Sequence, residues 1–77
     1  MTSVHSRPYR LFLGQLKIAR VSAGLTQADV AHRLKRYQSY VSKCESGERR
    51  VDIIDLVEFA DLYGRPLGYF VKKSRDP

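Results

Sequence analysis

The chain has 77 residues, of which 43% are hydrophobic, and it carries a formal net charge of +6. This length allows one small domain with a thin core, and the hydrophobic content excludes a disordered chain. The single cysteine excludes an internal disulfide, and no apolar run is long enough for a membrane span or a signal peptide, so we expect a cytoplasmic protein.

Apolar residues at helical spacing predict a first helix over residues 9–23, which Gly24 stops. Residues 1–8 show no periodicity and end at Pro8, so we expect a flexible tail there. Thr26 is a favourable N-cap for a second helix that runs through Leu34, and Asp29 stands three residues on, where a capping-box acid belongs. The first half of the domain is therefore predicted to be helical.

Further helices are predicted after a polar interruption at residues 35–37. A third helix covers residues 38–45 and is closed by Ser46 and Gly47, and Asp52 can cap a fourth helix that Gly64 ends. Pro66 suits the first turn of a last short helix, and residues 73–77 are expected to be frayed. We therefore predict an all-α fold, a compact bundle of five short helices in a domain of residues 9–72.

The positive charge is concentrated in the first two-thirds of the chain. Residues 1–51 contain ten Lys or Arg against three Asp or Glu, whereas residues 52–77 contain four against five. A charge that served only solubility would have no reason to segregate in this way. The distribution favours a polyanionic partner such as nucleic acid.

Two short helices joined by a tight turn, in a basic all-helical chain, are typical of the helix-turn-helix. Further features of the chain are more specific. They are Leu25-Thr26-Gln27 at the entry, Ala31 at the helix crossing, Val41-Ser42-Lys43 and Glu45-Ser46-Gly47 in the second helix, and Phe59-Ala60 and Tyr63-Gly64 beyond it. With these features the chain resembles the Cro/C1-type family of transcriptional regulators, also called the XRE family, over about residues 10–71. The resemblance implies a lambda-repressor-like domain with the motif at its second and third helices.

The resemblance also implies that the third helix reads duplex DNA. With Val41 and Cys44 turned inward, its outward side chains can meet base edges, since Gln pairs with adenine and Lys with guanine. Arginines in the turn and in the loop after the helix are natural phosphate clamps, although each could simply be solvated. The predicted DNA-binding residues are Gln27, Arg36, Tyr37, Gln38, Ser39, Ser42, Lys43, Arg49 and Arg50.

Two details of the motif lead to structural expectations. In several relatives an ion pair ties the first helix to the end of the third, and the resemblance implies the same pair between Arg20 and Glu45. The turn departs from the family pattern, because Lys35 stands where glycine is common and is followed by the bulky Arg36-Tyr37. If Lys35 adopts the left-handed backbone of that glycine, strain of about 1 kcal/mol follows. The alternative is a turn of another shape.

Two surfaces of the second half of the chain invite interpretation. Leu67, Tyr69 and Phe70 offer apolar surface in a region through which the family often dimerises, so we expect a homodimer there. Acidic residues recur every three positions in the fourth helix, and we interpret them as a solvated outer face, with a partner-protein site as the alternative. They are Asp52, Asp55, Glu58 and Asp61.

The expected function is sequence-specific binding of double-stranded DNA as a transcriptional regulator, a repressor that acts as a dimer on a pseudo-palindromic operator. The alternatives are a protein-interaction adaptor and an antitoxin that neutralises a toxin, both with the same fold. The sequence has no nucleophile–base arrangement, phosphate-cradling glycine loop or metal-ligand spacing. We therefore expect no enzymatic activity, small-molecule substrate, cofactor, metal or membrane partner.

Overall fold

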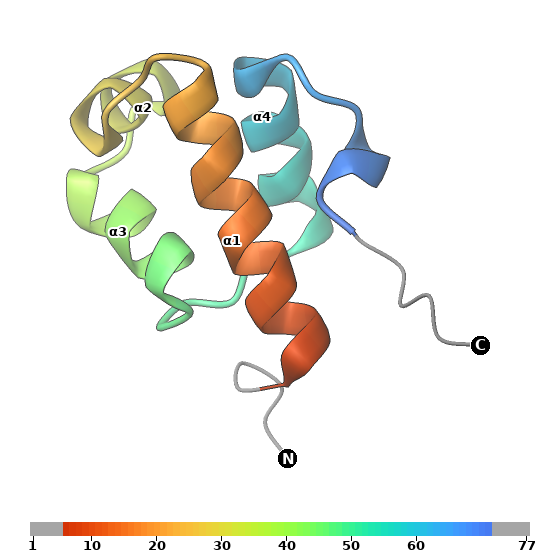
Figure 1. Cartoon of the computed structure of the whole chain (residues 1–77). Coiled ribbons are helices and arrows are strands. Elements are labelled where there is room, and N and C mark those ends of the chain that lie inside the picture. The colour runs from red at the N-terminus through yellow and green to blue at the C-terminus, as the bar shows by residue number, and fades with distance from the viewer. Residues whose placement is uncertain (1–5, 72–77) are drawn as a thin grey trace.

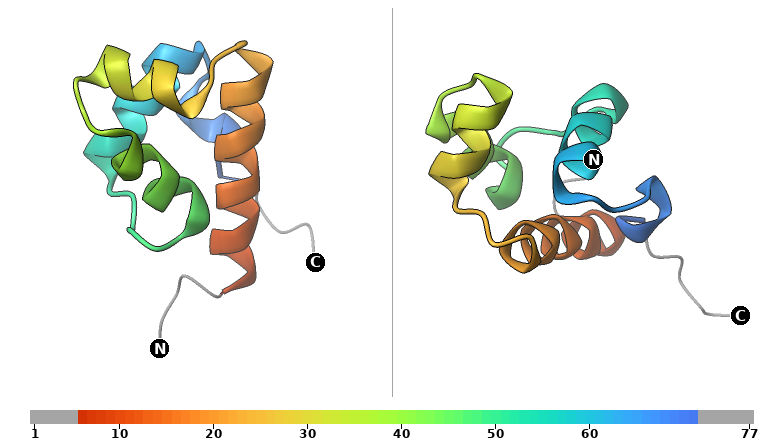
Figure 2. Two further views of the ribbon diagram at one scale, coloured as in Figure 1. Left: turned by 90° about the vertical axis from the view of Figure 1, so that its left-hand side faces the viewer. Right: turned by 90° about the horizontal axis from the view of Figure 1, so that it is seen from above.

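The computed structural model describes residues 6–71, and in that range it contains helices and no strand. The elements are α1 (Arg7–Ser22), α2 (Gln27–Leu34), α3 (Gln38–Ser46), α4 (Ile53–Tyr63) and the 3-10 turn η2 (Leu67–Tyr69). In Figure 1, α2 and α3 lie to the left of α1, and η2 lies to its right, on the other side of the domain. The view from above in Figure 2 shows the same separation. The all-α prediction is confirmed, and the last predicted helix is a single 3-10 turn.

The first helix begins at Arg7, two residues before the predicted start at Tyr9. Ser6 is its N-cap, and the Ser6 Oγ accepts a hydrogen bond from the Tyr9 backbone N–H at 3.3 Å. Pro8 lies in the first turn, where its missing N–H leaves no helical hydrogen bond unmade. The predicted tail was therefore too long, because its proline begins a helix instead of preceding one. The rest of that tail and residues 73–77 lie outside the described residues.

The second helix has the predicted cap at its start and a left-handed residue at its end. Thr26 Oγ1 accepts from the Asp29 N–H at 3.0 Å, and Asp29 Oδ2 accepts from the Thr26 N–H at 2.9 Å. This backbone hydrogen bond lowers the pKa of Asp29 below its ordinary value. Lys35 has φ 59° and ψ 47°, and the next N–H, that of Arg36, donates to the Ala31 carbonyl at 2.9 Å. The turn thus keeps the shape that glycine would give it, and Lys35 bears the strain.

Replacing Lys35 with glycine is therefore expected to raise the melting temperature by a few degrees. The left-handed conformation costs about 1 kcal/mol for an L-residue, and about 1 kcal/mol moves the melting temperature of so small a domain by about 4–8 °C. The larger entropy of glycine in the unfolded chain offsets part of this gain. Calorimetry of Lys35→Gly beside Lys35→Ala, which keeps the strain, makes the comparison. A Lys35→Gly protein that melts below the wild type would refute the strain.

All four helices and the segment after η2 contribute to one core. Its buried members are Leu16, Ala19, Val30, Ala31, Val41, Cys44, Leu56, Phe59, Ala60, Tyr63 and Phe70. The rings of Tyr40, Phe59 and Tyr63 stack in sequence, with centroid separations of 6.1 and 5.9 Å. Burial raises the pKa of the Cys44 thiol, which suits a structural rather than a reactive cysteine. Within residues 6–71, no helix combines the length and apolar character that crossing a membrane requires.

The core includes a residue that was predicted to serve dimerisation. Phe70 is fully buried, and its ring packs edge-on against that of Tyr69 at 5.1 Å. Phe70 therefore belongs to the fold of the protomer and offers no surface to a second copy. Leu67 remains 42% exposed and Tyr69 is half-buried. The 3-10 turn brings Phe70 inward because the short segment after Gly64 must close over α1 and α4.

Candidate nucleic-acid interface

The third helix has an anchored side and an open side. Val41 and Cys44 are fully buried, whereas the predicted base-reading residues are exposed on the opposite side. These exposed residues are Gln38, Ser39, Ser42 and Lys43. Because residues three and four apart lie on one side of a helix, the four form a single polar surface. Their side chains offer amide, hydroxyl and ammonium groups to whatever approaches this surface.

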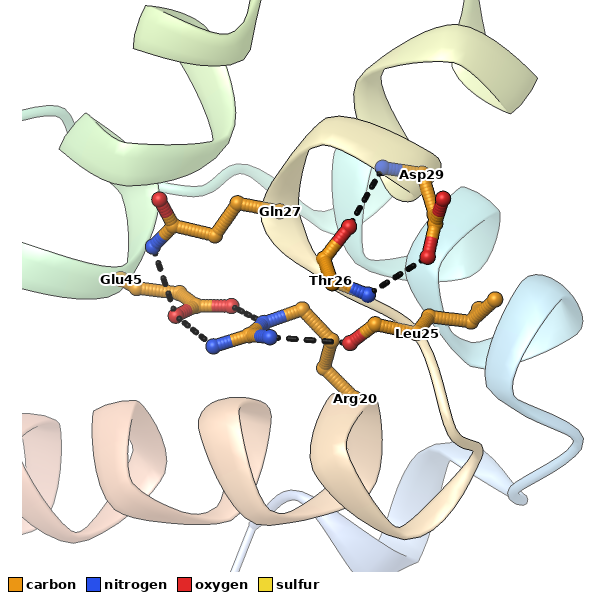
Figure 3. A network of polar contacts seen from close by, with 6 residues as sticks. All are labelled: Arg20, Leu25, Thr26, Gln27, Asp29 and Glu45. Atoms are coloured by element: carbon orange, nitrogen blue, oxygen red, sulfur yellow. Dashed lines mark hydrogen bonds and ion pairs between the residues drawn. The ribbon is translucent and has the colours of Figure 1, made fainter.

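An ion pair fixes the end of α3 to the end of α1 (Figure 3). The Arg20 Nε donates to Glu45 Oε2 at 2.6 Å, and the Arg20 Nη2 donates to Glu45 Oε1 at 3.1 Å. The Arg20 Nη1 also donates to the Leu25 carbonyl at 2.9 Å. The two side chains are only 11% and 6% exposed, and their hydrogen bonding raises the pKa of Arg20. Arg20 and Glu45 thus form the pair that the family resemblance implies, in bidentate geometry.

The Gln27 side chain, in the first turn of α2, also takes part in this network. Its Nε2 donates to Glu45 Oε1 at 3.1 Å (Figure 3). Glu45 therefore ties the last turn of α3 to the first turn of α2 as well as to α1. Gln27 was predicted as a DNA-binding residue, and its hydrogen bond to Glu45 was not predicted because no local spacing relates residues 27 and 45.

Arg36, which was predicted as a phosphate contact, is exposed and directed toward α4. Its guanidinium carbon lies 4.3 Å from the centroid of the Tyr40 ring, a cation–π contact. Its Nη2 lies 4.0 Å from Asp55 Oδ1 and 3.9 Å from Glu58 Oε1. The acidic groups of α4 thus hold Arg36, and they fasten the strained turn to the body of the domain.

Asp55 contradicts the prediction that the acidic residues of α4 form one solvated face. It is only 7% exposed, whereas Asp52, Glu58 and Asp61 are exposed. Residues three apart on an α-helix drift by about 60° per step, so four of them cover half the circumference. One must then lie at the edge of the core. Asp55 does, and its Oδ2 lies 3.8 Å from the Arg49 Nη2.

Arg49 and Arg50 lie in the loop after α3, where both are exposed and each contacts an aromatic ring. The Arg49 guanidinium lies 5.0 Å from the Tyr40 ring centroid, and that of Arg50 lies 4.9 Å from the Tyr9 centroid. The Val51 N–H donates to the Tyr9 hydroxyl at 3.0 Å, which fastens the loop to α1. The loop starts at Gly47, where φ is 88° and an added Cβ would lie 3.0 Å from the Leu13 side chain. Only glycine fits there.

Tyr37 stands at the other end of α3, as its N-cap. Its side chain makes no capping hydrogen bond and is 85% exposed. The ring is therefore available on the same side of the motif as the start of α3. Sequence reasoning identified Tyr37 but missed Tyr9 and Tyr40, whose roles depend on residues far along the chain.

Comparison with known families agrees with this architecture. A family model described as a helix-turn-helix domain matches residues 11–68, which cover most of the chain and include α2, the turn and α3. No curated protein shows a significant match. A helix-turn-helix places its second helix in the major groove of DNA, and the exposed side of α3 carries the side chains for that position. The chain belongs to the helix-turn-helix domain family.

Proposed function

We propose that this protein is a cytoplasmic transcriptional regulator of the Cro/C1 type that binds a specific sequence in double-stranded DNA. The observation that carries the proposal is the exposed polar side of α3, where Gln38 and Lys43 stand opposite the fully buried Val41 and Cys44. Gln can pair with the N6 and N7 edge of adenine and Lys with the O6 and N7 edge of guanine. The function is binding and not catalysis.

The backbone contacts in this proposal come from the residues that flank α3. Arg49 and Arg50 lie in the exposed loop that follows the helix, and Tyr37 lies before it. Phosphate contacts of this kind set the position of the protein on the duplex, while the α3 side chains select the sequence. The excess of positive charge in residues 1–51 adds attraction to the duplex at long range.

Two measurements test this function together. Selection of bound sequences from random duplex DNA should yield one enriched motif, and the logarithm of the affinity for that motif should fall linearly with the logarithm of salt concentration. The slope is about −0.9 for each phosphate neutralised. A flat salt dependence without enrichment would refute DNA reading and would favour the adaptor or antitoxin function.

We further propose that the regulator is a repressor that binds a pseudo-palindromic operator as a homodimer. Leu11, Gln15 and Ile18 share one side of α1, and the Gln15 side chain donates to the Tyr69 carbonyl at 3.4 Å. Leu11 and Ile18 are exposed there, and Leu67 of η2 is exposed as well. Because Phe70 is buried, these three residues are the ones that supply an apolar surface for a second copy. A dimer would set two α3 helices about 34 Å apart on the DNA.

The dimer predicts that Leu67→Glu gives a monomer, because the substitution introduces charge at an exposed apolar site without touching the core. Light scattering of the free protein and of its DNA complex measures the mass. Ser22→Glu, at an exposed polar position of α1, adds the same charge as a control. A wild type that is monomeric in both states would contradict the homodimer and leave the DNA contacts of α3 in place.

A further inference from the structure

Four side chains form a cluster between α3 and α4: Arg36, Tyr40, Arg49 and Asp55, here called the Asp55 cluster. Both arginines contact the Tyr40 ring, at 4.3 and 5.0 Å. Both also lie within ion-pair distance of the Asp55 carboxylate, at 4.0 and 3.8 Å. One arginine comes from the turn before α3 and the other from the loop after it. A single carboxylate on α4 therefore meets the chain on both sides of the base-reading helix.

Because Asp55 is buried, its carboxylate and the two arginines depend on one another. A carboxylate that is 7% exposed loses most of its hydration, so a nearby cation is needed to offset the cost. The backbone N–H of Asp55 is already used, since it donates to the Asp52 Oδ1 at 2.9 Å. The side chain lies within ion-pair distance of the two arginines, and the Tyr40 ring that both arginines contact is held in turn by stacking on Phe59. The positions of both arginines thus depend on one buried charge.

The cluster also supplies what the packing of α3 lacks on this side. The backbone of α3 packs chiefly against α2 and α1, and the Arg20–Glu45 pair strengthens those contacts. Toward α4, the contacts described above are made by side chains, namely Tyr40 on Phe59 and the arginines on Asp55. Loss of the Asp55 charge should therefore tilt α3 or release Arg49 while the stacking of Tyr40 on Phe59 keeps the core closed.

We propose that Asp55 is a positioning residue for sequence recognition: it holds Arg36 and Arg49 at the two ends of α3 and so sets how the base-reading side meets DNA. The inference rests on the proposed DNA binding. Asp55 is buried and negative, so it contacts neither base nor phosphate itself. Removing its charge has two opposite consequences. Weaker repulsion of phosphate raises affinity for any duplex, whereas loss of positioning lowers the preference for the correct one.

The matched pair Asp55→Asn and Asp61→Asn separates these consequences. Each removes one negative charge from α4, but Asp61 is exposed. Anisotropy titrations would use the selected operator duplex and a scrambled duplex of equal length, at several salt concentrations. Asp61→Asn should strengthen binding to both duplexes alike and leave their affinity ratio unchanged. Asp55→Asn should lower that ratio about tenfold, with the scrambled duplex bound at least as tightly as by the wild type.

Each alternative outcome has a definite meaning. A wild type without operator preference would overturn the proposed function and this inference with it. A wild type with that preference, beside an Asp55→Asn protein whose ratio matches that of Asp61→Asn, would overturn the positioning role alone. If Asp55→Asn does not fold by circular dichroism, Arg49→Lys decides. It keeps the charge, so the salt slope should stay the same while the ratio falls about fivefold, and an unchanged ratio would overturn the proposal.

Discussion

Glu45→Ala is expected to lower the free energy of unfolding by about 3–5 kcal/mol, the usual cost of removing one partner of a buried ion pair. Glu45 accepts three of the hydrogen bonds at this site, two from Arg20 and one from Gln27. Its loss leaves a guanidinium that is 11% exposed without a counter-charge. Since the free energy of unfolding of a native protein is only about 5–15 kcal/mol, the variant should be partly unfolded at physiological temperature. Chemical denaturation followed by circular dichroism measures the loss.

The double variant Arg20→Met/Glu45→Leu should recover most of that stability. Apolar side chains of similar volume replace both charges, so no ion remains buried without a partner. The Leu25 carbonyl and the Gln27 amide still lose hydrogen-bond partners, which keeps the recovery incomplete. Glu48→Ala, an exposed acid in the loop after α3, serves as the control and should change little. Additive effects of the two single substitutions in a double-mutant cycle would contradict the coupling.

The helix ends were the part of the fold that the sequence predicted best. Thr26 and Asp52 cap α2 and α4 as expected, and Gly47 and Gly64 end α3 and α4 in left-handed conformations. Capping depends on residues within four positions of each other, so the information is local. The prediction that Pro8 ends a flexible tail was wrong, because α1 begins at Arg7 and Pro8 lies in its first turn. Proline both breaks helices and favours their first turn, and its neighbours did not decide between the two.

The electrostatic contacts of the site were less predictable. Arg36 and Asp55 are 19 positions apart, and their pairing exists only because α4 lies beside the turn. No periodicity within either segment indicates this pairing, so it was not predicted, and Asp55 was wrongly assigned to solvent. Arg20 and Glu45 are 25 positions apart and were paired only through the family resemblance. The sequence therefore identifies the charged residues, whereas the partner of each charge depends on its tertiary neighbours.

Gln38→Ala is expected to weaken binding to the selected operator by about 1–3 kcal/mol, which is the discrimination that one good base pair contact provides. Gln38 is neutral and exposed in the first turn of α3, so its truncation removes no phosphate contact and disturbs no packing. Affinity for a scrambled duplex and the salt slope should therefore stay as in the wild type. The selected motif should lose its preference at one position in each half-site.

Arg50→Gln is expected to weaken binding to every duplex, in contrast to the operator-specific loss expected of Gln38→Ala, and it therefore serves as the comparison for Gln38→Ala. It removes a charge from the exposed loop after α3, so binding should weaken by a similar factor on every duplex, and the salt slope should become shallower by about 0.9. Selection from random DNA should return the wild-type motif. The two variants thus divide the surface into a part that reads bases and a part that holds the backbone. Equal losses on operator and scrambled DNA for Gln38→Ala would place Gln38 with the backbone contacts, and the reading of sequence would then have to lie in Ser39, Ser42 and Lys43.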